Sequence, residues 1–204
     1  VYLLCVPGGW LADKYITHKN AVLYGGWLLC LGHLLLAVKH THVFFVGLLF
    51  IIIGVGLLKP SISTLVGSLY RETDVRRDQG FTIFYIGINL GAFFASILVG
   101  FVGEIYGWHY GFSLAGFGMI IGQIFFIRGK KHFQRDSRLR STKEKKNLTK
   151  TQIDRIKLII IASLILIIFW AAFEQAGGLL NIYAYEKTNR FLHAINFEIP
   201  ASWF

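Results

Sequence analysis

The chain has 204 residues, of which 54% are hydrophobic, 16% aromatic and only 16% charged, and its mean hydropathy is +0.55. Charged residues make up about a quarter of an ordinary soluble chain, and here the apolar residues are gathered in long runs, so the composition argues against a soluble domain and indicates a membrane protein. The formal net charge of +10 falls almost entirely in one loop between two apolar runs, which argues against nucleic-acid binding.

Other classes are excluded by residue types that are rare or absent. Three prolines, two cysteines and no heptad pattern rule out collagen, a disulfide scaffold and a coiled coil. Cys5 and Cys30 both lie in apolar runs and are interpreted as small hydrophobic residues. The sequence has no Cys/His metal spacing, no G-x-S-x-G and no glycine-rich phosphate loop before a helix, so we do not expect an enzyme.

One partial and five full apolar spans follow one another along the chain. Each full span reaches the roughly 20 residues that cross a bilayer as a helix, which predicts an all-α, multi-pass integral membrane fold. The chain opens inside an apolar run without Met, basic segment or cleavage site, so we expect an internal piece of a longer protein and no signal peptide. The partial span is 1–11, and the full spans are 20–38, 43–66, 81–102, 108–127 and 157–183.

Lys and Arg are distributed unevenly between alternate loops. Seventeen lie near residues 14, 74 and 140, three lie in the opposite loops, and one, Lys59, lies inside a span. Because positive residues are retained on the cytoplasmic side, the seventeen predict that these three loops are cytoplasmic. The stretch 128–156 is predicted to be a basic linker between two halves, 1–127 and 157–204. Near its end, Thr149-x-x-Gln152 has the form of a capping box for the following helix.

Two glycine pairs have the spacing of close helix contacts. Gly87 and Gly91 are four residues apart, as are Gly118 and Gly122. Such pairs place small residues on one helix face, where a neighbouring helix can approach closely. We therefore expect helix packing at both pairs.

Lys59 and Glu174 are ionisable residues inside predicted spans. A charge in hydrocarbon costs at least about 2.5 kcal/mol, so each should face a polar cavity or a partner. A structural ion pair is one interpretation. The functional interpretation is that Glu174 accepts and releases a proton, while Lys59 alternates between pairing with it and holding an anionic substrate.

Other polar and aromatic residues share helix faces with one another or with these charges. Trp170 is one turn before Glu174, Tyr85 one turn before Asn89, and Ser63 one turn after Lys59. An aromatic wall with an amide and a charge suits a polar ligand in an apolar cavity. His33, inside another span, is interpreted as a structural histidine.

Four motifs resemble the proton-dependent oligopeptide transporters, a branch of the major facilitator superfamily. Phe84-Tyr85-Ile-Gly-Ile-Asn89-Leu-Gly91 is similar to the family signature, and 77–81 extends it. Lys59-Pro60 resembles the fourth-helix lysine motif, 169–175 the seventh-helix motif, and 9–14 the cytoplasmic loop between helices two and three. The chain would then contain helices two to seven of a twelve-helix fold, in which two halves rock about a midplane site.

The resemblance implies proton-coupled symport of di- and tripeptides, with no metal or organic cofactor, in a lipid bilayer that we expect to be a bacterial inner membrane. It implies that Lys59 contacts the peptide carboxylate and that Glu174 is the proton-linked acid. Gly9 would permit close helix approach at the cytoplasmic gate. The resemblance assigns the peptide site to Tyr2, Lys59, Asn89, Trp170 and Glu174, the gate to Gly9, Asp13 and Lys14, and the signature to Phe84, Tyr85, Asn89 and Gly91.

Departures from the family pattern leave alternatives open. The first helix with its E-x-x-E-R motif and helices eight to twelve are not in the sequence, and the stretch between the halves is too short for the two extra helices of many bacterial members. The chain alone is therefore not expected to transport. A related symporter of another anion or a drug is one alternative. A truncated, non-transporting membrane protein is another.

Overall fold

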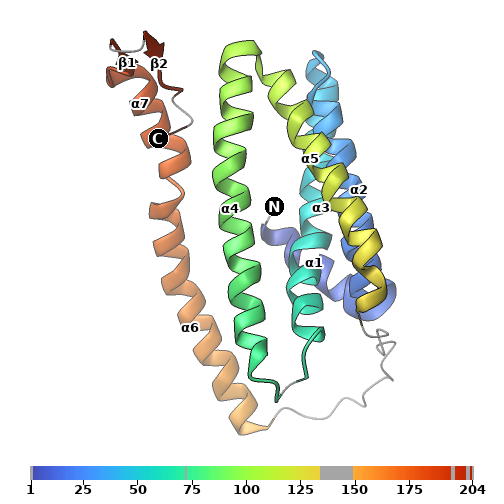
Figure 1. The fold of residues 1–204 in the computed structure, drawn as a ribbon. Helices are drawn as coiled ribbons and strands as arrows, with labels where there is room; N and C mark the ends of the chain where they lie inside the picture. The colour runs from blue at the N-terminus through green and yellow to red at the C-terminus, as the bar shows by residue number, and fades with distance from the viewer. Residues whose placement is uncertain (1, 72, 134–148, 194–195, 201–202, 204) are drawn as a thin grey trace. The chain divides into compact units, whose positions relative to one another are not determined.

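The computed structural model describes residues 2–71, 73–133, 149–193, 196–200 and 203 (Figure 1). Most of the predicted basic linker, 134–148, lies outside the described residues. The chain divides into two compact units, Val1–Ser141 and Thr142–Phe204, and each is described by itself.

The first unit is a bundle of five helices joined by short turns. Helix α2 packs on α3 and α5, α1 packs on α3, and α4 packs on α5. The turns that carry Lys14, Lys19 and Arg71 lie at one end of this unit, while the α2/α3 and α4/α5 turns lie at the other (Figure 1). The basic turns therefore share one end, as the charge count predicts. The helices are α1 (Tyr2–Leu11), α2 (His18–Leu36), α3 (Thr41–Ser68), α4 (Arg76–Tyr106) and α5 (Trp108–Gly129).

Glycines allow α2 and α3 to pack backbone against backbone. A Cβ on Gly25 would lie 2.7 Å from the carbonyl oxygen of Gly54, and one on Gly32 would lie 2.9 Å from that of Gly47. These distances are too short for any larger residue, so the sequence keeps glycine on both helices.

Within the described residues, the two glycine pairs Gly87/Gly91 and Gly118/Gly122 are not in close contact with another helix. A Cβ on Gly87, Gly91, Gly118 or Gly122 would meet no atom of the described chain within 4 Å. Spacing reports which residues share a helix face, whereas the rotation of the helix decides whether that face meets a neighbour.

Where α2 meets α5, a glycine on each helix faces a polar side chain on the other. Gly26 of α2 lies against the side chain of Gln123, and Gly116 of α5 lies against His33. Gln123 is buried and His33 is half-buried, so each polar side chain occupies the space that a glycine leaves on the opposite helix. His33 is thus packed between helices, as expected of a structural histidine.

Two turns depend on positive backbone φ angles. Helix α1 continues into a π-helical turn, η1 (Ala12–Ile16), and the chain reverses at Thr17, which has φ 75° and ψ 145°. Between α4 and α5 the reversal falls on Gly107, with φ 112°. Glycine adopts this conformation without strain, whereas threonine does not.

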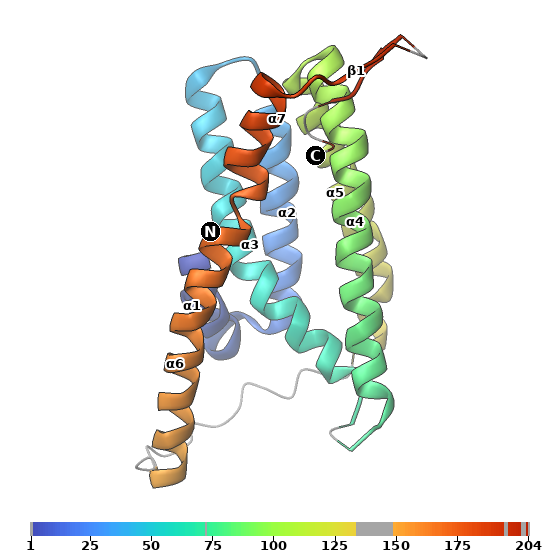
Figure 2. The same cartoon turned by 90° about the vertical axis from the view of Figure 1, so that its left-hand side faces the viewer.

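The second unit begins with a capped helix and ends in a short hairpin. Thr149 accepts a hydrogen bond from the backbone of Gln152, whose side chain accepts one from the backbone of Thr149, so the predicted capping box is confirmed. The helical path bends where α6 gives way to η3 and α7 (Figure 2). The elements are α6 (Lys150–Phe173), the π-helical turn η3 (Ala176–Leu180), α7 (Asn181–Lys187), β1 (Phe191–Leu192) and β2 (Phe197–Glu198).

Four helical segments of the described chain are long and apolar enough to cross a membrane: α3, α4, α5 and the stretch Lys150–Lys187. The sequence predicts five full spans; the fifth, 20–38, is the 19-residue helix α2, which is not among these four. Helix α2 begins with His18, Lys19 and Asn20, and these polar residues offset its apolar remainder. The prediction of an all-α membrane fold is confirmed.

Candidate functional site

Lys59 and Tyr2 are brought together from two helices. The Nζ atom of Lys59, on α3, lies 4.3 Å from the centroid of the Tyr2 ring, on α1. This cation–π contact is the interaction that the structure gives the Lys59 side chain within the described residues. Both side chains are exposed in the first unit. The ammonium group therefore remains open to a negatively charged partner.

Pro60 and two glycines set the distance between these helices. Proline has no N–H, so the carbonyl of Gly56 loses its usual hydrogen bond within α3. Gly8 of α1 lies directly against that carbonyl, and a Cβ there would be 2.6 Å from the carbonyl carbon. A Cβ on Gly9 would meet Pro60 only at 3.5 Å, an ordinary contact. The tightest approach of α1 to α3 thus falls on Gly8, and the role of Gly9 at the gate stays a prediction.

The signature on α4 presents an open polar and aromatic face. The side-chain amide of Asn89 donates to the carbonyl of Tyr85, 2.8 Å away, one turn earlier. Both side chains are exposed, and Tyr85 is 65% exposed. Phe84 is half-buried, and a Cβ on Gly91 would meet no described atom within 4 Å. Tyr85 and Asn89 therefore share one accessible face, as their spacing predicts.

Trp170 and Glu174 stand where a long helix is interrupted. The backbone N–H of Glu174 donates to the carbonyl of Trp170 at 2.9 Å, which places the two residues one turn apart. The Trp170 ring packs edge-on against Phe173, with centroids 5.3 Å apart. Helix α6 ends at Phe173, so Glu174 is the first residue beyond it.

The interruption is a feature that the sequence-based prediction of one continuous span missed. Beyond Glu174 the chain forms η3, in which the N–H groups of Gly178 and Leu180 both donate to the carbonyl of Gln175. The adjacent Gly177 and Gly178 were the available signal, since two glycines weaken a helix. Interrupted membrane helices commonly form binding sites in transporters, because their free backbone groups can meet a ligand.

The predicted peptide-site residues are distributed over both units. Tyr2 and Lys59 are in contact, and Asn89 is on another helix of the same unit. Trp170 and Glu174 belong to the second unit. The pairing of Glu174 with Lys59 stays a prediction.

The α1/α2 turn holds the predicted gate residues, together with one that the sequence-based analysis missed. Asp13 Oδ1 lies 3.0 Å from Nε2 of His18, whose side chain is buried. Lys14 lies over the rings of Trp10 and Tyr15, 5.1 and 5.3 Å from their centroids. His18 contributes to the turn as the partner of Asp13, and its position five residues after Asp13 was the available signal.

A second contact joins this turn to the end of α5. The ammonium group of Lys19 donates to the carbonyl of Phe133 at 2.9 Å. This bond fixes the start of α2 relative to the segment after α5. The turn is thus held from both α1 and the segment after α5.

Relatives of known name match most of the chain. It is 32% identical to the peptide transporter YePEPT of Yersinia enterocolitica, over all of this chain and 53% of the relative. It is 40% identical to a di-/tripeptide transporter of Lactococcus lactis subsp. cremoris, over 81% of this chain and 34% of the relative. The chain thus spans about half the length, or less, of the curated relatives it matches.

Solved structures show the same fold. A mutant of a peptide transporter POT, in complex with alafosfalin, superimposes with a TM-score of 0.77 at 29% identity, over 99% of this chain and 52% of that one. The structure is accordingly part of a major facilitator superfamily fold. Residues 19–147 match the sequence model of the POT family, and the chain therefore belongs to this family of membrane transporters.

Proposed function

We propose that the protein containing this chain is a symporter of di- and tripeptides, driven by protons and working by alternating access. The observation that carries the proposal is the Lys59 ammonium, held in an apolar helix with only an aromatic ring as its partner among the described residues. A carboxylate is the complement of such a group, and every peptide ends in one. Relatives named as peptide transporters support the same substrate class.

In this proposal the two charged residues have separate tasks. Lys59 binds the carboxylate end of the peptide, while Tyr2, Asn89 and Trp170 line the site. Glu174 carries the proton, because it is a carboxyl within an apolar stretch, at the point where α6 ends, and an ionisable residue there marks a proton pathway. Release of Lys59 from Glu174 to the peptide would then link proton movement to substrate binding.

The proposed organisation divides the chain between two rocking halves. Helices α1 to α5 belong to the N-terminal half, α6 begins the C-terminal half, and the basic stretch 128–156 joins them on the cytoplasmic side. Because the named relatives are bacterial, we place the protein in a bacterial inner membrane. The turn that contains Asp13 and Lys14 serves as part of the cytoplasmic gate.

Uptake by the intact protein in proteoliposomes tests the function. With an inward proton gradient, labelled dialanine should accumulate, and collapse of the gradient should abolish accumulation. Alafosfalin and 5-aminolevulinic acid belong in the competitor panel, because solved family members hold these molecules. Absence of dialanine uptake together with uptake of another anion would overturn peptide transport in favour of a different substrate.

Two variants test the residue roles. Lys59→Gln should abolish uptake, with Lys157→Gln as the matched control on an exposed lysine. Glu174→Gln should abolish accumulation against a gradient yet retain exchange of peptide across the membrane, with Glu186→Gln as control. Gradient-driven accumulation by Glu174→Gln would remove the proton role from that residue.

A further inference from the structure

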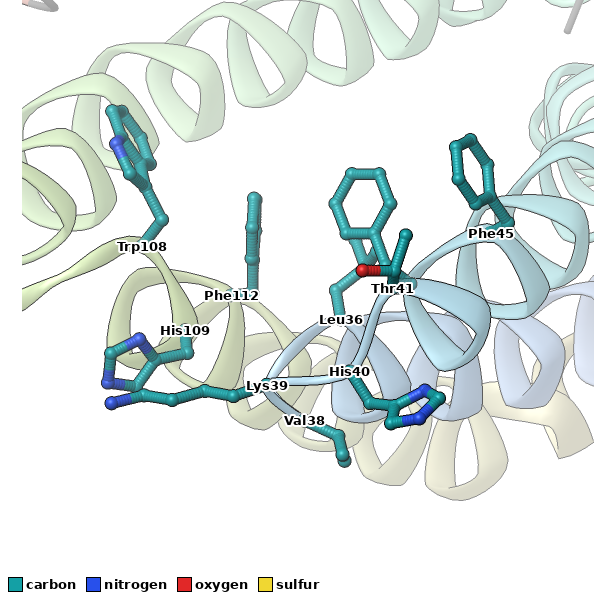
Figure 3. A pocket seen from close by; sticks show the side chains of 10 residues that line it. Leu36, Val38, Lys39, His40, Thr41, Phe45, Trp108, His109 and Phe112 are labelled. Atoms are coloured by element: carbon teal, nitrogen blue, oxygen red, sulfur yellow. The ribbon is translucent and has the colours of Figure 1, made fainter.

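A cavity of about 500 Å³ opens at the end of the first unit opposite the basic turns. It lies between the α2/α3 turn and the first turn of α5 (Figure 3). Thr41, which lines the cavity, is the first residue of α3 and lies eighteen positions before Lys59. Along the helix axis the two residues are therefore about 27 Å apart. The cavity is therefore separate from the proposed peptide site.

One side of this cavity is basic. The Lys39 side chain runs beside the imidazole of His109 (Figure 3), and His40 is a third nitrogen-bearing group in the lining. No carboxylate lines the cavity, and within the described residues Lys39 makes no ion pair. Three Lys and Arg residues lie in the loops opposite the predicted cytoplasmic ones. Of these three, Lys39 alone belongs to the first unit. A lysine beside the His109 imidazole, without an ion-pair partner among the described residues, favours an anionic ligand.

The helix ends at the cavity are also electrostatically positive, like the Lys39 side chain. Both α3 and α5 begin there, and neither has a side-chain cap: His40 makes no capping hydrogen bond, and Gly107 has no side chain to offer. The N-terminus of a helix carries a partial positive charge on its free N–H groups. These ends add to the attraction that Lys39 and His109 exert on an anion.

The other side of the cavity is aromatic. The rings of Trp108, Phe112 and Phe45 project to one side of the pocket, away from Lys39 and His109 (Figure 3). Trp108 is 52% exposed and Phe45 62% exposed, at the ends of helices that span the membrane. Aromatic rings at this depth mark the boundary between headgroups and hydrocarbon. A small inorganic anion would use the basic side alone, whereas a lipid would use both.

We propose that this cavity binds an anionic phospholipid of the outer leaflet. Its phosphate lies between Lys39 and His109, and its acyl chains run along Trp108, Phe112 and Phe45. The proposal commits to a lipid because the basic and the aromatic sides adjoin at the level of the headgroups. It does not depend on the transported substrate.

Native mass spectrometry of the intact protein with phosphatidylglycerol tests the site, and phosphatidylcholine with the same acyl chains tests the need for negative charge. The double variant Lys39→Gln/His109→Gln should bind phosphatidylglycerol at least about fivefold more weakly, since a lysine near a membrane surface contributes about 1 kcal/mol. The control Lys187→Gln/His193→Gln removes the same residue types from outside the cavity and should bind as the wild type does.

Four results decide the matter. Lys39→Arg should bind phosphatidylglycerol as the wild type does, because arginine keeps the positive charge. This variant also shows that position 39 tolerates replacement. Equal binding of the two lipids by the wild type, or equal phosphatidylglycerol binding by the double variant and the control, would overturn the proposal. Displacement of the lipid by excess inorganic phosphate would reassign the cavity to free anions.

Discussion

The contact between Gly8 and Gly56 offers the sharpest test of the α1/α3 packing. Gly8→Ala places a Cβ 2.6 Å from the carbonyl carbon of Gly56 and 3.2 Å from the backbone nitrogen of Leu57. Both are backbone atoms and cannot rotate aside, so α1 has to shift. Gly9→Ala is the matched control, because its nearest contact would be Pro60 at 3.5 Å.

The expected magnitude follows from the difference between the two variants. Each gains up to about 1 kcal/mol of helix propensity when glycine becomes alanine. That gain cancels in the comparison, and what remains is the overpacking at Gly8, typically about 1–3 kcal/mol. Gly8→Ala should therefore be less stable than Gly9→Ala by this amount.

Thermal unfolding of the intact protein in detergent measures the difference, as a lower Tm for Gly8→Ala than for Gly9→Ala. Uptake gives a second readout, because a shift of α1 also moves Tyr2 relative to Lys59. Equal Tm values for the two variants would refute the close α1/α3 contact.

Three further predictions concern single side chains. Tyr2→Phe should preserve the peptide KM, whereas Tyr2→Ala should raise it about two- to fivefold, because the ring contact that positions Lys59 contributes about 0.5–1 kcal/mol; equal KM values for the two variants would refute this. Thr17→Gly should raise the free energy of unfolding by about 1 kcal/mol, because it relieves strain at φ 75° while a glycine cap costs only a few tenths; a lower Tm than wild type would contradict it. The Arg76 guanidinium, which donates hydrogen bonds to Asp74, lowers the pKa of that carboxyl. The resulting stabilisation is present above the unfolded pKa of about 3.9 and is lost as the pH falls through the lower folded value. The Tm difference between wild type and Asp74→Asn should accordingly shrink on acidification through this range, and a constant difference would argue against it.

Composition and charge were sufficient to predict the class of the molecule. Long apolar runs require helices in a bilayer, because only helices satisfy every backbone group within one segment. The unequal distribution of Lys and Arg predicted that the turns containing Lys14 and Arg71 share one end, and they do. The capping box at Thr149 could also be predicted, because its hydrogen bonds join residues only three positions apart in the sequence.

The sequence also supplied the candidate site. A lysine or glutamate in an apolar helix costs free energy unless it faces a partner or a polar cavity, and such residues mark functional sites. Lys59 and Glu174 stand out on that ground alone. Motif resemblance then named the family, which the comparisons confirmed. Neither argument could show that the partner of Lys59 within the first unit is the ring of Tyr2.

Tertiary structure decided what depends on the rotation and the distance of helices. It placed a close contact at Gly8, left Gly87 and Gly91 without a neighbour within 4 Å among the described residues, and paired His18 with Asp13. Spacing along a helix fixes which residues share a face, but only packing determines which face meets another helix. For that reason the helices and their charges were predictable from this sequence, whereas their contacts had to be seen in three dimensions.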